Sequence, residues 1–161
     1  IYGFLYGAGD EKIGQIINKG AKAGKAIKKK FLDKVPALKK LRDAVNAKAE
    51  DGFIRGLDGR IIPIRHPHAA LNTLLQSAGA IICKRWYVQM EQDLRSAGYS
   101  EEDVAIVAFV HDEVQIQVRQ GLEDAIGNIV KQAMHKVEQY YKFKCPLDSE
   151  YSYGPNWADT H

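Results

Sequence analysis

The stretch V-A-I-V-A-F-V-H-D-E-V-Q-I-Q-V, at residues 104–118, decides the fold that we expect for this chain. Its first seven residues form a nearly continuous apolar run, which is typical of a strand. Its last five alternate apolar and polar residues with a period of two, which is typical of a second strand. The sequence H-D-E between the two runs predicts the turn of an antiparallel hairpin.

Helical patterns flank this hairpin on both sides. Residues 67–97 carry apolar residues at helical spacing, with Gly98 as a stop signal, and predict one long, largely buried helix. Residues 122–141 predict another helix, and residues 143–161 an irregular tail. We therefore expect an α+β fold in which helices pack on a small antiparallel sheet.

The region before the long helix is divided into a helical and a β-prone part. Residues 10–50 have a helical pattern interrupted by Pro36, which disfavours helical angles at Val35 and predicts two helices with a bend there. Residues 53–65 predict a β-hairpin turning at Asp58-Gly59. No linker separates two domains.

Composition limits the class of protein. The 161 residues are 45% hydrophobic and 27% charged, which fits one soluble domain or a piece of a larger protein and excludes a disordered or collagen-like chain. No apolar stretch is long enough for a membrane helix, residues 1–6 do not form a signal peptide, and Cys83 and Cys145 lack metal-site spacing. We expect a cytoplasmic location, and the initial Ile1 in place of Met predicts a cut product or fragment.

Charge is distributed unevenly along the chain. Up to Lys48 there are 12 basic and 4 acidic residues, which gives +8, whereas the remainder has 11 basic and 16 acidic residues, which gives −5. The first segment suits a polyanion such as nucleic acid, although a solvated helix surface explains its lysines equally well.

Two adjacent carboxylates, Asp112 and Glu113, lie at the predicted hairpin turn beside His111. Carboxylate oxygens suit Mg²⁺, which takes one or two of them and completes its shell with water and phosphate. Acids are also common in turns for structural reasons, and a lone histidine is more often structural than catalytic.

Two further groups of residues suit a ligand with bases and sugars. Tyr2 and Tyr6 are spaced to share a helix face and could stack on a base, while Gly9 allows close approach; core packing of the tyrosines is the alternative. His68, Asn72 and Gln76 form a polar row at four-residue spacing, which bonds either to the protein's own backbone or to a ligand.

Read in order, these motifs resemble the C-terminal part of family A (polymerase I-like) DNA polymerases, particularly the replicative enzymes of short-tailed bacteriophages. The opening I-Y-G-F-L-Y-G-A-G-D-E-K-I-G resembles the end of motif B in the fingers, and H-A-A-L-N-T-L-L-Q-S-A-G-A resembles the palm helix that follows. V-H-D-E-V resembles motif C, and the closing G-P-N-W-A-D-T-H resembles the end of the phage enzymes.

The resemblance implies a role for each candidate residue. Asp112 corresponds to the motif C aspartate that binds two catalytic Mg²⁺ ions, Glu113 to an auxiliary carboxylate, and His111 to a residue near the primer 3′ end. Tyr2 corresponds to the tyrosine that packs on the incoming dNTP. The remaining matches lie near the templating base or in the minor groove of the primer-template DNA: Tyr6, Gly9, His68, Asn72 and Gln76.

The resemblance also implies an incomplete enzyme. It assigns residues 1–52 to the fingers and residues 53–161 to the palm, and it places the motif A aspartate and the motif B lysine and arginine upstream of residue 1. The expected chemistry is two-metal nucleotidyl transfer in DNA replication, in the cytoplasm of an infected host. We expect little activity from the isolated chain, and self-association through apolar surface that the missing N-terminal part would cover.

Two other functions remain open. A non-catalytic nucleic-acid-binding module would use the lysine-rich helices alone, with Asp112 as a mere turn residue. A metal-dependent phosphohydrolase using His111 and Asp112 would need further histidines at ligand spacing, which the other four do not provide.

Overall fold

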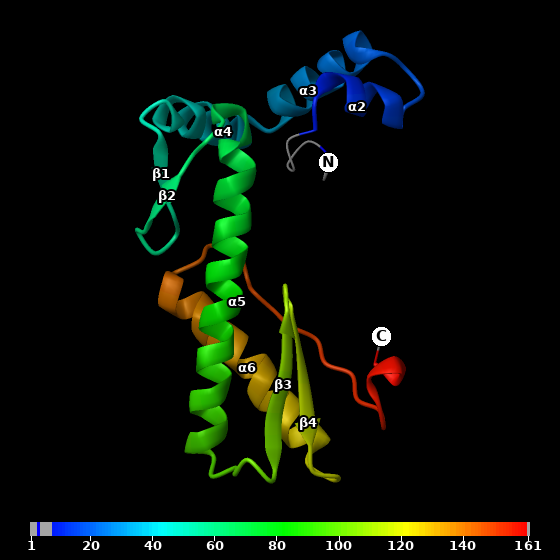
Figure 1. The fold of residues 1–161 in the computed structure, drawn as a ribbon, viewed down its shortest axis with the longest axis vertical. Coiled ribbons are helices and arrows are strands. Elements are labelled where there is room, and N and C mark those ends of the chain that lie inside the picture. Colours follow the sequence, from blue (N-terminus) through cyan, green and yellow to red (C-terminus); the bar gives the residue numbers. More distant parts are fainter. Residues whose placement is uncertain (1–2, 4–7, 161) are drawn as a thin grey trace. The chain divides into compact units, whose positions relative to one another are not determined.

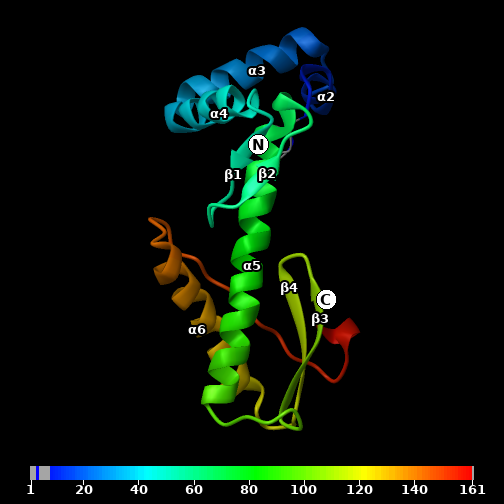
Figure 2. The same ribbon diagram turned by 60° about the vertical axis from the view of Figure 1, so that its left-hand side comes forward.

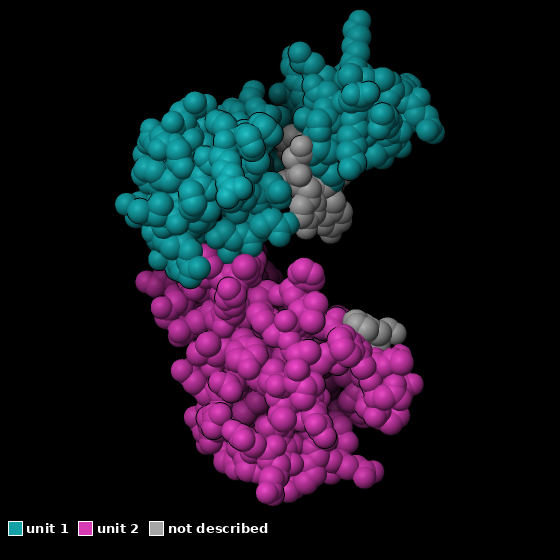
Figure 3. Space-filling view, viewed as in Figure 1, with its two compact units in different colours: residues 1–78 teal, residues 79–161 magenta. Residues whose placement is uncertain are grey.

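The computed structural model describes residue 3 and residues 8–160. The chain forms two compact units, residues 1–78 and residues 79–161 (Figure 3). The longest helix, α5 (Ala70–Ser96), contributes residues to both units. The assignment of residues 1–52 to fingers and 53–161 to palm stays a prediction.

Residues 10–49 form three helices, and not the expected two: α2 (Asp10–Ile16), α3 (Ala21–Lys34) and α4 (Pro36–Ala49). The predicted boundary at Pro36 is confirmed, since Val35 is non-helical and Pro36 begins α4. The missed break lies between α2 and α3, where Asn18 adopts a left-handed conformation with φ of 53°. Asparagine tolerates this region because its short polar side chain bonds locally.

The predicted hairpin of unit 1 is confirmed. Strands β1 (Phe53–Arg55) and β2 (Ile61–Pro63) pair antiparallel. The turn requires Gly59, whose φ is +83°, a region that side chains with a Cβ rarely adopt. A small core of Val45, Ala49, Ile54 and Ala70 packs this hairpin against α4 and the start of α5.

The long helix begins later than predicted. Pro67 starts the short 3₁₀ helix η1 (Pro67–Ala69), and α5 follows directly and ends at Ser96, before Gly98 with φ of +87°. The expectation of a largely buried helix is wrong along one side, because Leu75 and Val88 are exposed. The start of α5 contributes Ala70 to the core of unit 1 and its later turns contribute Trp86, Met90 and Leu94 to the core of unit 2, whereas Leu75 and Val88 belong to neither.

The hairpin of unit 2 is made of β3 (Val104–Val110) and β4 (Glu113–Val118), which pair antiparallel. The expected three-residue turn is a two-residue turn, His111-Asp112, because Glu113 already pairs with Val110. An irregularity between Ile106 and Ala108 shifts the register, which is typical of a β-bulge.

Helix α6 (Glu123–Tyr141) packs with α5 and the hairpin around the core of unit 2 (Figures 1 and 2). Trp86 also links the helices directly, since its indole Nε1 donates a hydrogen bond to the Val130 carbonyl at 2.9 Å. The buried residues of this core are Trp86, Met90, Leu94, Ile126, Val130, Ala133, Met134 and Val137. Apolar residues of both strands cover it, so the predicted α+β class is confirmed.

The tail after α6 is irregular, as predicted, apart from the 3₁₀ helix η2 (Trp157–Asp159). Across the described part of the chain, no helix combines the length and apolarity needed to cross a membrane.

Candidate functional site

The tip of the β3–β4 hairpin presents the predicted acidic residues. His111 and Asp112 form the turn and are exposed, with His111 in the left-handed region at φ of 57°. Glu113 is half-buried at the start of β4, and its carboxylate accepts a hydrogen bond from the Gln115 side chain. The two carboxylates are therefore not equivalent: Asp112 projects from the turn, and Glu113 is anchored to its own strand.

These carboxylates can supply part of a cation site. Hard carboxylate oxygens suit Mg²⁺, which usually completes its coordination with water and phosphate oxygens. Among residues 3 and 8–160, no group of three or more His, Cys, Asp or Glu side chains is placed to hold a metal ion. Asp112 and Glu113 thus fit the donor type of a Mg²⁺ site without completing one.

Cys83, on α5, is close enough to the tip for its pKa to respond to the charge of Asp112, which no local sequence signal indicates. Burial raises the pKa of the Cys83 thiol, and the negative charge of Asp112 raises it further. On the same side of α5, the Tyr87 ring packs against Phe109 of β3 with centroids 5.6 Å apart. Helix α5 therefore supports the hairpin behind the tip, and no local sequence signal indicates this pairing.

The predicted polar row is only partly brought together, within unit 1. Asn72 and Gln76 lie one turn apart on α5, whereas His68 belongs to η1 and stacks on His66 with ring centroids 5.5 Å apart. The expected four-residue helical row is therefore wrong for His68, because Pro67 begins a 3₁₀ turn there. The Asn72 Oδ1 is buried without a hydrogen-bond partner among the described residues.

Of the predicted nucleotide-binding residues, only Gly9 lies in the described part of the structure. It precedes α2 in an extended conformation and is exposed, and a Cβ added there would meet nothing within 4 Å. The open space is compatible with the close approach of a ligand. Tyr2 and Tyr6 lie outside the described residues.

The lysines of α3 are exposed with one exception. Lys28 is half-buried, and its ammonium lies 2.9 Å from Asp10 Oδ1 and donates a hydrogen bond to the Ala8 carbonyl at 3.1 Å. The exposed members give this helix a basic surface: Lys22, Lys25, Lys29, Lys30 and Lys34.

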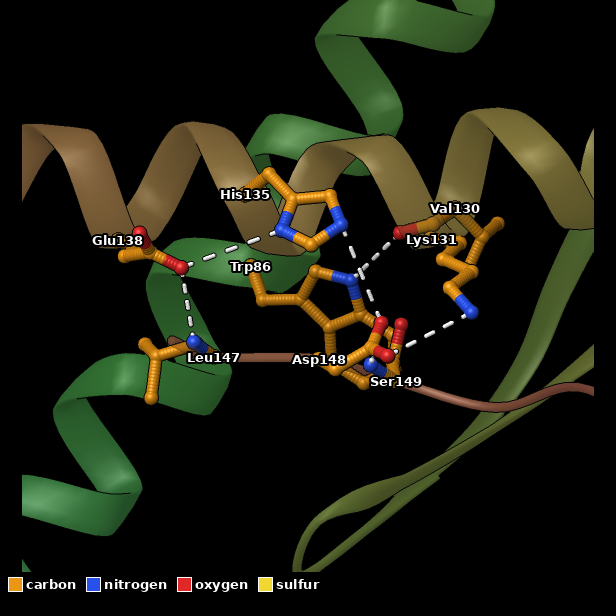
Figure 4. A network of polar contacts seen from close by, with 8 residues as sticks. All are labelled: Trp86, Val130, Lys131, His135, Glu138, Leu147, Asp148 and Ser149. Atoms are coloured by element: carbon orange, nitrogen blue, oxygen red, sulfur yellow. Dashed lines mark hydrogen bonds and ion pairs between the residues drawn. The ribbon is translucent and has the colours of Figure 1, made fainter. Parts of the chain in front are cut away.

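The tail is fastened across one side of α6 (Figure 4). The Leu147 N–H donates to Glu138 Oε2 at 2.8 Å, and Asp148 lies 3.5 Å from the Lys131 ammonium. The Ser149 N–H, with lesser help from Lys131 and His135, lowers the pKa of Asp148. No local sequence signal indicates this attachment, because its partners are separated along the chain.

Comparisons with known proteins agree with these observations. A family model described as DNA polymerase family A matches residues 1–159. The DNA-directed DNA polymerase of Escherichia phage T7 is 44% identical over 180 aligned residues that cover 100% of this chain and 26% of the relative. The enzyme of Enterobacteria phage T3 is 43% identical with the same coverage. The chain thus spans about a quarter of the length of the curated relatives it matches.

A solved structure supports the fold. The POL domain of Pol1 from M. smegmatis, in complex with DNA primer-template and dNTP, superposes with a TM-score of 0.73 at 22% identity, covering 84% of this chain and 26% of that one. At this identity the likeness concerns the fold alone. Since the family model matches nearly every residue and the phage relatives align with the whole chain, the protein belongs to DNA polymerase family A.

Proposed function

We propose that this chain is the part of a longer DNA-directed DNA polymerase that carries the motif C carboxylates and the end of motif B. The observation that carries the proposal is the hairpin tip, where Asp112 projects from a two-residue turn and Glu113 is held beside it. Membership of DNA polymerase family A supports this interpretation. The substrates are primer-template DNA and dNTPs, and the site of action is the cytoplasm of a phage-infected bacterium.

In this proposal Asp112 provides the principal metal-binding oxygens. Its exposure at the turn leaves its oxygens accessible, whereas the Gln115 amide already occupies one oxygen of Glu113 and gives that carboxylate an auxiliary role. When bound, two Mg²⁺ ions would activate the primer 3′ hydroxyl and stabilise the charge on the leaving pyrophosphate. His111, in the same turn, would lie near the primer 3′ end.

Other residues of the chain would bind the substrates. The Asn72 Oδ1, which has no hydrogen-bond partner among the described residues, would accept a hydrogen bond from a guanine amino group in the minor groove once its side chain turns outward, and Gln76 and His68 would lie along the same groove. Tyr2 would pack on the incoming dNTP, with Tyr6 and Gly9 near the templating base. The basic surface of α3 would face the DNA backbone.

The chain alone should have little activity, because two carboxylates from one hairpin supply only part of the ligands for two metals. We expect no measurable extension of a primed template by the 161-residue chain with Mg²⁺ and dNTPs. Addition of a polypeptide that contains motif A and the upstream part of motif B should restore synthesis. Extension by the chain alone would contradict this part of the proposal.

Substitution of Asp112 tests the assignment of the metal ligand. In the reconstituted enzyme, Asp112→Ala should abolish extension, whereas the control Glu102→Ala, an exposed acid in the loop before β3, should leave it unchanged. DNA binding that depends on salt but is insensitive to both Mg²⁺ and Asp112→Ala, without any extension, would favour a non-catalytic nucleic-acid-binding module.

The uncovered side of the β3–β4 hairpin is the surface proposed to contact the rest of the polymerase. Val107 is 61% exposed and Val110 46% exposed. Exposure of neighbouring apolar side chains to water is unfavourable and is typical of a surface that another protein segment covers. Without its partner this surface should drive self-association. Analytical ultracentrifugation should show a concentration-dependent oligomer that Val107→Thr weakens; an unchanged monomer in both proteins would contradict this assignment.

A further inference from the structure

Lys28 holds the residues that lead into α2. Its side chain is 24% exposed, and its ammonium contacts both the Asp10 carboxylate, at 2.9 Å, and the Ala8 carbonyl, at 3.1 Å. Every other lysine of α3 is exposed. The Lys28 ammonium thus contacts residues 8–10 at both ends of this segment, although Lys28 follows the segment in the chain by about twenty positions.

Two glycines explain how this lysine reaches its partners. A Cβ added at Gly24 would collide with the Asp10 carbonyl oxygen, and one added at Gly14 would collide with the Gly20 carbonyl oxygen. The backbones of α2 and α3 are therefore in direct contact at these glycines. Lys28 follows Gly24 by one helical turn on the same face, so its side chain extends over the start of α2.

The segment that Lys28 holds adjoins residues with a role in the proposed function. Gly9 belongs to the segment itself, and Tyr6 is only two residues before it. Because a half-buried lysine with two oxygen acceptors is worth more than an exposed pair, its loss should free this segment. We infer that Lys28 is a positioning residue: through Asp10 and Ala8 it fixes residues 8–10 in the conformation that holds the templating base opposite the incoming dNTP.

This inference rests on the proposed function and makes separate predictions for structure and kinetics. In the 161-residue chain, Lys28→Met should accelerate amide hydrogen exchange at Ile13, whose N–H bonds to the Gly9 carbonyl, while Lys28→Arg restores much of the protection. In the reconstituted enzyme, Lys28→Met should raise KM for dNTP about tenfold and change kcat less than about threefold. Lys144→Met, which removes an exposed lysine of the tail, is the charge-matched control.

The outcomes separate the inference from the proposed function. An active enzyme in which Lys28→Met and Lys144→Met have the same KM would overturn the inference alone. A reconstituted wild type that neither extends a primer nor binds dNTP would overturn the proposed function and, with it, the role of Lys28. If Lys28→Met unfolds unit 1, Asp10→Asn provides the test, because it removes the ion pair and retains the hydrogen bond from Lys28 to the Ala8 carbonyl. A rise in KM of less than about tenfold supports the inference, and an unchanged KM overturns it.

Discussion

The α2–α3 pair of unit 1 and the α5–α6 pair of unit 2 are held together by different interactions. Helices α5 and α6 share a core of eight buried residues, including the fully buried Met90 and Val137. Helices α2 and α3 bury only Ile13 and Leu32 among their large apolar side chains and meet through backbone contact at Gly14 and Gly24. Apolar burial therefore stabilises the hairpin carrying Asp112, whereas close backbone packing and one ion pair shape the proposed nucleotide-binding segment.

We expect the two helix pairs to differ in mobility. Apolar contacts act collectively over a large area, so the support behind the hairpin should be rigid. A helix pair with little buried apolar area opens locally at lower free energy. We therefore expect the chain to combine a fixed metal-binding element with a more adaptable substrate-binding one.

The largest expected effect comes from the core of unit 2. Met90→Ala should lower the free energy of unfolding by about 2–5 kcal/mol, because it leaves a cavity in a closed apolar cluster. The comparison is Leu41→Ala on α4, which should lower the free energy of unfolding by less than about 1 kcal/mol, because the Leu41 side chain is 41% exposed. Urea denaturation followed by circular dichroism measures both, and equal losses would contradict the close packing of the core that α5 and α6 share.

A smaller effect is expected at the α2–α3 contact. Gly24→Ala should destabilise unit 1 by about 1–3 kcal/mol, because the methyl group would push the backbones of the two helices apart. Gly79→Ala on α5, where a Cβ would meet nothing within 4 Å, should instead stabilise the protein by about 0.5–1 kcal/mol. Thermal unfolding of the two variants should shift in opposite directions; a shift in the same direction would mean that α2 and α3 are not in backbone contact.

The attachment of the tail to α6 should be sensitive to Gly127. The Tyr151 ring occupies the space that a Cβ at Gly127 would need, so Gly127→Ala should displace the tail at a cost of about 1 kcal/mol. Limited proteolysis of residues 146–160 should be faster in this variant than in the wild type. The neighbouring exposed Asn128 provides the control, since Asn128→Ala should leave the cleavage rate unchanged.

The smallest effect is a dependence of stability on pH through Asp103, before β3. Hydrogen bonds from the Ser100 N–H and hydroxyl, together with the Arg119 charge, lower the pKa of Asp103 below 3.8. A lowered folded-state pKa stabilises the protein above the unfolded pKa, and this contribution is lost as the pH falls through the folded value. Asp103→Asn should therefore be less stable than the wild type at pH 7, and the difference should shrink as the pH falls through the folded-state pKa of Asp103; a constant difference would contradict this account.

The strands and most helix ends could be predicted from the sequence. Alternation at residues 114–118 predicted β4, and Pro36 and Gly98 marked boundaries that the structure retains. Such signals are local, since they depend on neighbouring residues and on backbone angles that proline and glycine restrict or permit. The acidic turn was also evident from its position between two apolar strands.

Other features could be identified only in the folded chain. The break at Asn18 was missed because the helical periodicity of the apolar residues continues through it, and only the contact between Gly14 and Gly24 shows why the chain reverses there. His68 was misplaced because a 3₁₀ turn has a different spacing from an α-helix. The exposure of Val107 followed from the small size of the sheet, since an apolar strand needs a covering element on each face to be fully buried.

The sequence by itself determined which residues can form strands, which end helices, and where two carboxylates share a turn. Tertiary structure alone decided that Lys28 reaches Asp10, that Cys83 lies near Asp112, and that the tail crosses α6 at Lys131 and Glu138. The reason is physical: backbone preferences act over a few neighbouring residues, whereas contacts between distant residues depend on how whole helices and strands pack around a core.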